Sequence, residues 1–198
     1  MVMAPDLAER HDDARTAARA VLHPVGTPDL PRPTPCRGWN LRTLTEHMIG
    51  QNEGVATAIA GGDADVTAYT PRPVADPAGL MQAWDESVGH LRAAVDAADP
   101  HQPVRLVEIA RVATVPAAAA VGMHLLDAVV HTWDVATALG ERYRPEQALL
   151  DLVVDGSLQV PAGDARTRPA AAFAPSIEAT NTDPWTVSLA RLGRSWTA

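Results

Sequence analysis

Apolar residues recur at intervals of three and four along most of the chain, which is the spacing of one face of an α-helix. The clearest stripe lies between about residues 77 and 98. Its members follow one another at spacings of four, four, three and four: Leu80, Trp84, Val88, Leu91 and Val95. Further stripes predict helices over about 5–22, 41–60 and 115–139, one starting near 145, and a short one at 184–192. Alternating runs typical of strands are weak.

Residues that start and stop helices support these limits. Asn40 is a good N-cap for the helix beginning at Leu41, and the Gly61-Gly62 pair is a stop signal. Pro116 is tolerated in a first turn, and Gly140 suits a C-cap. Long helices with a loop at 63–76 between two of them predict an all-α four-helix bundle with at least one crossover connection. We expect the bundle to occupy residues 1–160, with a short mixed C-terminal extension, 161–198, packing on it.

Composition and charge exclude several classes of protein. The formal net charge is −8, and no basic stripe runs along any expected helix. This argues against nucleic-acid binding and against attraction to an anionic membrane surface. All 16 basic residues are Arg. The lack of Lys excludes lysine Schiff-base chemistry and a P-loop lysine.

The single cysteine, Cys36, rules out an internal disulfide and a Cys-based zinc cluster. The first residues, MVMAPDLAERHDD, are acidic and lack the apolar segment of a signal peptide. No stretch approaches the roughly 18 apolar residues of a membrane span. We therefore expect a soluble, cytoplasmic protein.

Asp127 and His131 are the most informative pair in the chain. They lie four residues apart in the apolar, Ala-rich stretch 112–140. On a helix this spacing stacks both side chains on one face, about one turn apart. A carboxylate and an imidazole presented in this way form half of a metal site.

The best donor of a third ligand is His47, on the expected helix that begins at Leu41. Bundles build metal sites from side chains that project inward from facing helices. Two His and one carboxylate leave coordination positions open, as a catalytic site needs. His124 shares the face of Asp127 and His131, and we expect it to support the site or the core. The remaining histidines fall near polar or loop sequence and carry no site signal: His11, His23, His90 and His101.

Simpler interpretations stay open for each of these residues. Asp127 and His131 could hydrogen-bond each other on a solvated face, and His47 could be a core histidine. Asp134 could orient the imidazole of His131, or could be a surface or Arg-paired residue. Cys36 could be a reactive thiol, although a small buried apolar role is favoured.

Two blocks of this sequence resemble a known family. TPCRGWN at 34–40, running on to Leu44 and His47, resembles the T-P-C-x-G-W-[DN]…L…H opening of the mycothiol-dependent maleylpyruvate isomerase N-terminal family. That family belongs to the DinB-like superfamily of metal-binding four-helix bundles. Asp127, with HTWDVA at 131–136 and ALG at 138–140, resembles its E-x-x-x-H-x-W-D-L-A-x-A-x-G block. The tail from Leu189 to Arg194 resembles the L-x-x-L-G-R ending of one actinobacterial branch.

The resemblance implies an up-down-down-up bundle with a divalent metal, typically zinc or nickel. It places the metal ligands on His47, Asp127 and His131. Asp127 stands where the family usually has Glu, so its side chain is one methylene shorter. The metal would then lie nearer the Asp127 helix, or a water would bridge the two.

The resemblance also implies a metal-dependent transferase or isomerase that uses mycothiol. The metal would lower the pKa of this low-molecular-weight thiol, and the thiolate would attack a small electrophile. Arg37 and Arg42 could bind a substrate carboxylate, while no other catalytic residue is assigned. The alternatives are a metal-hydroxide hydrolase and a non-catalytic bundle that binds a metal or small ligand. Uncovered bundle faces often pair, so a homodimer is left open.

Overall fold

A computed structural model describes residues 5–61, 64–108, 114–167 and 171–195 of the chain. The chain divides into two compact units, Met1–Tyr143 and Arg144–Ala198, and each is described here by itself. The expected division at residue 160 stays a prediction.

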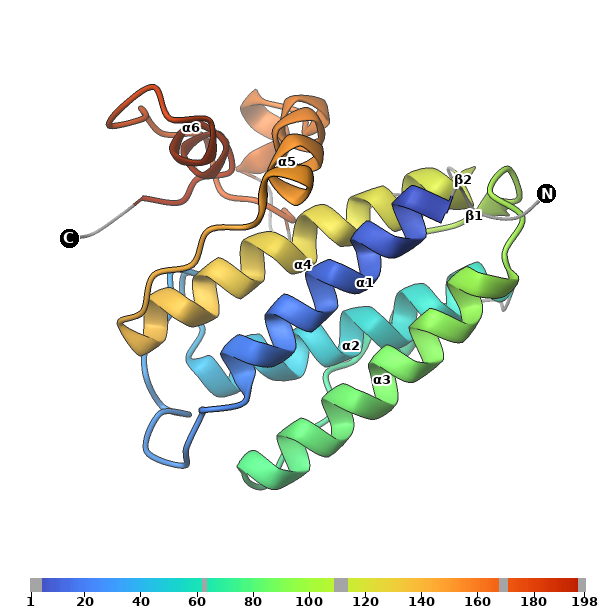
Figure 1. Cartoon of the computed structure of the whole chain (residues 1–198), viewed down its shortest axis with the longest axis horizontal. Coiled ribbons are helices and arrows are strands. Elements are labelled where there is room, and N and C mark those ends of the chain that lie inside the picture. The colour runs from blue at the N-terminus through green and yellow to red at the C-terminus, as the bar shows by residue number, and fades with distance from the viewer. Residues whose placement is uncertain (1–4, 62–63, 109–113, 168–170, 196–198) are drawn as a thin grey trace. The chain divides into compact units, whose positions relative to one another are not determined.

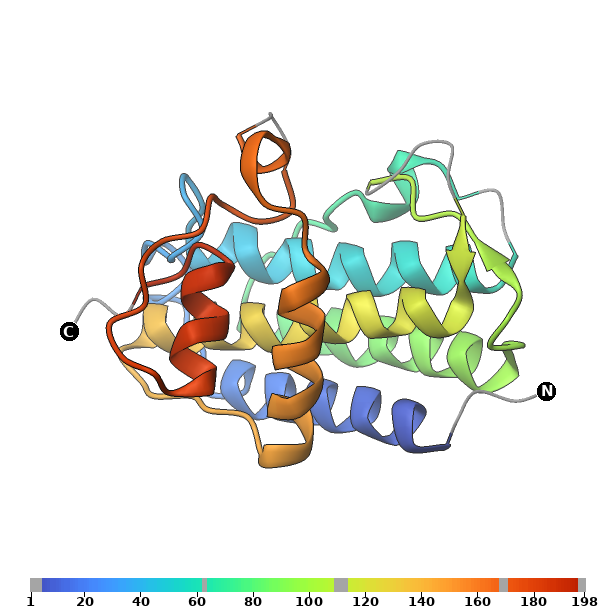
Figure 2. The ribbon, with the colours of Figure 1, turned by 90° about the horizontal axis from the view of Figure 1, so that it is seen from above.

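The first unit is a four-helix bundle, shown in Figures 1 and 2. Its helices are α1 (Pro5–Leu22), α2 (Leu41–Ile59), α3 (Pro77–Ala97) and α4 (Ala117–Leu139). Helices α1 and α4 run in one direction and α2 and α3 in the other, so the predicted up-down-down-up order is confirmed. Because α2 and α3 are parallel, the chain between them must cross the length of the bundle. This connection contains the short 3₁₀ helix η1 (Val66–Tyr69).

Capping residues fix the helix ends close to where the sequence places them. The Oδ1 of Asn40 accepts a hydrogen bond of 2.9 Å from the backbone N–H of Thr43, which satisfies a free donor at the start of α2. Gly140 ends α4 with a φ of 79°, a conformation that strains other L-residues. Helix α4 begins two residues later than expected, because Val115 and Pro116 form the strand β2.

Strand β2 (Val115–Pro116) pairs antiparallel with β1 (Pro103–Val104). Neither strand exceeds two residues, so neither leaves an alternating pattern in the sequence.

The crossover connection packs closely on α2 at two glycines. A Cβ added to Gly54 would lie 2.3 Å from the Cδ1 of Tyr69, and one added to Gly50 would lie 2.5 Å from the Tyr69 carbonyl oxygen. The two glycines therefore form the slot in which Tyr69 is buried. This contact anchors η1 to the helix that carries His47.

Apolar side chains from all four helices form the core. At one end, Leu22 of α1 packs with Leu44 of α2, Trp84 of α3 and Val135 of α4 in a single buried cluster. Burial of these large side chains supplies the main stabilisation of the bundle, about 1.5–3 kcal/mol for each fully buried aliphatic or aromatic residue.

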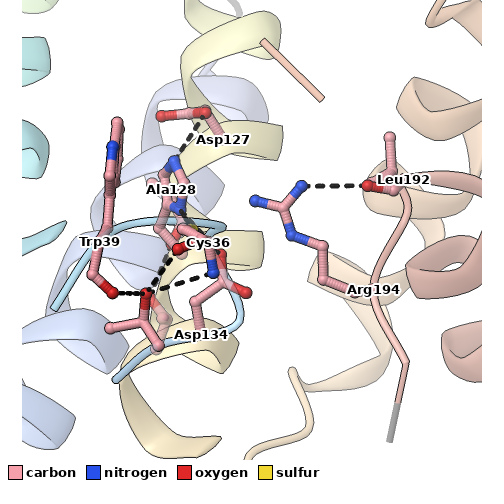
Figure 3. A network of polar contacts seen from close by, with 10 residues as sticks. Cys36, Trp39, Asp127, Ala128, Asp134, Leu192 and Arg194 are labelled. Atoms are coloured by element: carbon pink, nitrogen blue, oxygen red, sulfur yellow. Dashed lines mark hydrogen bonds and ion pairs between the residues drawn. The ribbon is translucent and has the colours of Figure 1, made fainter. Parts of the chain in front are cut away.

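The second unit contains α5 (Gln147–Gln159), the 3₁₀ helix η2 (Gly163–Arg166) and α6 (Pro184–Arg191). Arg166 ties its irregular segments together by donating to the carbonyl oxygens of Pro161 at 2.5 Å and Val160 at 3.1 Å. Near the end of the unit, Arg194 donates to the carbonyl oxygen of Leu192 at 3.0 Å (Figure 3). Among the described residues of the chain, no helix has the length and apolar character to cross a membrane.

Candidate metal centre

The structure brings together the three residues that the sequence nominates as metal ligands. His47 of α2 and Asp127 and His131 of α4 each offer one ligand atom, and these atoms lie within 4.8 Å of one another. The Nε2 of His131 is 3.3 Å from the Oδ1 of Asp127. The rings of His47 and His131 meet edge to face, with centroids 5.4 Å apart. Two imidazoles and a carboxylate are a donor set that suits zinc, nickel or iron.

Helix geometry explains this convergence. The four-residue spacing places Asp127 and His131 one turn apart on the same face of α4, which is otherwise lined by buried apolar residues. On α2, Leu44 and Met48 point into the core on either side of His47, which itself is half-buried. The packing of α2 against α4 therefore brings His47 next to Asp127 and His131.

A second carboxylate holds the far side of the His131 ring. The Oδ2 of Asp134 lies 2.9 Å from the Nδ1 of His131, and Asp134 is fully buried (Figure 3). Because Nδ1–H donates to this carboxylate, Nε2 is the ring nitrogen of His131 that faces Asp127. Of the two roles open for Asp134, the structure therefore supports orientation of the His131 imidazole.

Cys36 contacts the same pair. Its Sγ donates to the Oδ2 of Asp134 at 3.2 Å and lies 3.8 Å from the Nδ1 of His131. The side chain is half-buried. The sequence favoured a small buried apolar role for Cys36. It could not reveal these polar contacts, because they join segments that are 95 residues or more apart in the sequence.

The indole of Trp39 forms one wall of the centre. Its ring centroid is 4.7 Å from that of His47 and 6.4 Å from that of His131, and its plane is inclined by 29° to the His131 ring. Trp39 follows the tight turn at Gly38, where φ is 82°, and precedes the Asn40 cap. The TPCRGWN segment thus places both an aromatic wall and a thiol beside the three candidate ligands.

Burial and charge set the protonation of the three side chains. Burial lowers the pKa of His47 to about 4, against the attraction of Asp127, so this imidazole is neutral at pH 7. For Asp127, burial would raise the pKa, but the charge and hydrogen bond of His131 outweigh it and hold the pKa below its usual range. For His131, burial lowers the pKa, but Asp127 and Asp134 outweigh it and raise it above 6.5. A metal at this centre would therefore displace a proton held between His131 and Asp127.

The two arginines proposed for a substrate carboxylate differ in their surroundings. Arg37 is exposed in the turn next to Cys36. The guanidinium of Arg42 is half-buried and donates to the carbonyl oxygen of Val74. Arg37 is thus the more accessible of the two candidates, and a substrate role for either stays a prediction.

The structure also shows a buried histidine pair that the sequence did not reveal. His11 is completely buried, and its Nε2 lies 2.8 Å from the Nδ1 of His124 on α4. The surrounding sequence, AERHDDAR, is polar, so local pattern alone suggested a solvated histidine. The sequence did contain one signal of burial. His11 follows Leu7 by four residues and precedes Ala14 and Ala18 by three and seven, so it lies on the apolar face of α1.

Known proteins share part of this sequence. The family model described as the mycothiol maleylpyruvate isomerase N-terminal domain matches residues 11–136. Two proteins from strains of Mycobacterium tuberculosis, named as uncharacterized proteins MT0763 and Rv0738, are each 31% identical over 134 residues. The match covers 66% of this chain and 66% of the length of each relative.

Two solved structures share the fold. They are a mycothiol-dependent maleylpyruvate isomerase and a mutant of such an enzyme, with TM-scores of 0.53 and 0.56 and identities of 19% and 18%. Each comparison covers 80% of this chain and 73% of the other.

Proposed function

Because the chain belongs to the mycothiol maleylpyruvate isomerase N-terminal domain family, we propose that it is an enzyme that uses a divalent metal to activate a low-molecular-weight thiol. Zinc or nickel would be held by His47, Asp127 and His131, and mycothiol is the thiol that the family suggests. The substrate would be a small electrophile, and the reaction a transfer or an isomerisation. The observation that carries this proposal is the convergence of two imidazoles and one carboxylate within 4.8 Å.

The bound metal would supply one element of chemistry, the lowering of the thiol pKa so that a thiolate is present at neutral pH. The chain's own residues prepare the centre for it. Asp134 keeps a proton on the Nδ1 of His131 and so presents the Nε2 of that ring as a ligand. His47 is already neutral at pH 7 and needs no deprotonation to bind.

The residues around the centre suit a thiol and an organic electrophile. Trp39 covers the two imidazoles with an apolar face and limits the access of water on that side. The exposed guanidinium of Arg37 offers a partner for a carboxylate on the electrophile.

Thiol binding to protein with and without zinc tests this proposal. We expect zinc-loaded wild-type protein to bind mycothiol in calorimetry and to speed its conjugation to a fluorogenic electrophile, and the metal-free protein to do neither. The variants His47→Ala and Asp127→Ala should lose both zinc and activity. His101→Ala removes an exposed histidine and should behave as wild type.

Two results would contradict the proposal in different ways. If zinc-loaded wild-type protein neither binds nor consumes the thiol, the enzymatic role fails, and a metal-binding module or a hydrolase becomes the better interpretation. If Asp127→Ala retains full zinc stoichiometry, the ligand assignment is wrong.

A further inference from the structure

A buried polar chain joins α1 to α4 behind the candidate metal centre. Arg15 and His11 of α1 and His124 of α4 are at most 5% exposed. Arg15 contacts the Nδ1 of His11, and the Nε2 of His11 is 2.8 Å from the Nδ1 of His124. Arg15 is balanced by an ion pair with Asp12. Burial of these polar and charged side chains is costly, so the contacts that pair them are a specific feature of the fold.

The donor at one end fixes the tautomer of both imidazoles. The Nη1 of Arg15 also lies 3.2 Å from the Nε2 of His11, but Nδ1 is the nearer of the two ring nitrogens. A guanidinium can only donate, so we assign Nδ1 as the acceptor and place the proton of His11 on Nε2. That Nε2–H then donates to the Nδ1 of His124. A neutral His124 must carry its own proton on Nε2. The chain therefore turns His124 into a hydrogen-bond donor of fixed orientation.

A small cavity lies beside His124, between α2, α3 and α4. Its polar lining comes from Gln51, Asn52, His124 and Asp127, and Ala128 forms part of its apolar wall. The cavity has room for about one water molecule. His124 thus shares a water-sized space with the carboxylate proposed to bind the metal.

The polar groups around this cavity suit water better than an anion. The amide nitrogen of Asn52 donates to the Oγ of Ser87 at 3.0 Å, and that of Gln51 donates to Glu108. The amide oxygens of Asn52 and Gln51 are left as acceptors, and Asp127, which lines the same cavity, adds a carboxylate. Three acceptors and the single N–H of His124 match a molecule that both donates and accepts.

We propose that this cavity binds one structural water, which accepts a hydrogen bond from the Nε2–H of His124 and donates one to Asp127. His124 is then a positioning residue that holds the Asp127 carboxylate in its orientation through the water. The effect on metal binding rests on the proposed function, whereas the water site does not. Hydrogen bonds to a ligating carboxylate commonly change metal affinity by tenfold to a hundredfold.

Three variants separate the water from a general packing effect. His124→Leu removes the donor, whereas His124→Gln offers an amide N–H near the position of Nε2. Ala128→Val keeps every polar group but fills the cavity. Thr132→Val is the matched control, because Thr132 is buried on α4 and donates to the Ala128 carbonyl oxygen rather than lining the cavity.

The first measurement is a high-resolution crystal structure of the metal-free wild-type protein. We expect a water within hydrogen-bond distance of the Nε2 of His124 and of Asp127, and no such water in Ala128→Val. An empty cavity in wild-type crystals that show other buried waters would overturn the inference. This result does not depend on whether the protein binds zinc, so it stands apart from the proposed function.

The second measurement is zinc affinity, by competition with a chromophoric chelator on protein shown to be folded by circular dichroism. His124→Leu and Ala128→Val should bind zinc at least tenfold more weakly, and His124→Gln and Thr132→Val within about threefold of wild type. Wild-type affinity in both Ala128→Val and His124→Leu would overturn the positioning role. A wild-type protein that binds no zinc would instead refute the proposed function.

Discussion

Removal of the Asp134 carboxylate is the sharpest test of how the centre is held. Asp134 is fully buried and lies 2.9 Å from the Nδ1 of His131. Asp134→Asn keeps an oxygen that can accept from Nδ1–H but loses the negative charge. Asp134→Ala loses both. Comparison of the two variants separates orientation of the ring from its electrostatic support.

The orienting role of Asp134 sets the expected loss of zinc affinity in each variant. Loss of a carboxylate that orients a ligating imidazole typically weakens metal binding by tenfold to a hundredfold, or about 1.4–2.7 kcal/mol. We expect Asp134→Asn near the lower limit and Asp134→Ala near the upper. One effect opposes this loss, because Asp134 also raises the pKa of His131, after the larger influence of Asp127. Without Asp134, fewer protons compete with the metal for His131.

Measurement at two pH values separates these effects. Near neutral pH, the weaker proton competition partly hides the lost orientation. At a pH above the raised pKa of His131 that competition fades, and the full loss of affinity should appear in a chelator-competition titration with zinc. Asp85→Asn, which changes an exposed carboxylate paired with Arg19, is the matched control. Unchanged zinc affinity in folded Asp134→Ala at both pH values would refute the role assigned to Asp134.

Three further predictions concern stability and ligand length. Burial lowers the pKa of His124 to about 4, so the unfolded state binds more protons than the folded state below about pH 6.5. The free energy of unfolding should therefore decrease as the pH is lowered from about 6.5 to 4, by about 3 kcal/mol for this group. Urea unfolding across this range should show this decrease in wild type and a smaller one in His124→Gln. Gly54→Ala should lower the free energy of unfolding in urea by about 1–3 kcal/mol, since its Cβ would meet the Tyr69 ring at 2.3 Å. Gly89→Ala, in open space on α3, should raise it by about 0.5–1 kcal/mol. Equal changes in the two variants would contradict the close packing of Tyr69 on Gly54. Asp127→Glu should retain full zinc stoichiometry by metal analysis, and its loss would show that the shorter side chain is required.

Local chemistry in the sequence accounts for the bundle. The limits of α1 and α2 follow from apolar periodicity and from Asn40, whose cap satisfies a backbone donor. The start of α4 was wrong by two residues, because pairing of β1 with β2 depends on segments too short to carry a period. The all-α fold was confirmed because helices are encoded by contacts within a few residues.

The candidate site was only partly predictable for the opposite reason. Asp127 and His131 were found because their four-residue spacing is itself a helical contact. His47 was nominated from a different helix, and the family resemblance added weight. The His11–His124 contact spans 113 residues, and a polar neighbourhood in the sequence concealed the burial of His11. Such pairs depend on how helices pack, which no local pattern encodes.

Asp127, His131 and Asp134 all belong to α4, at spacings of four and three. One rigid helix thus holds a candidate ligand carboxylate, a candidate ligand imidazole and the carboxylate that orients this imidazole in a fixed arrangement. Any drift of α2, through substitutions in the core or in the Tyr69 slot, changes the approach of His47 alone. In a metal-loaded protein, the position of His47 would then decide which cations bind best, while the geometry of the α4 residues stays the same in such variants.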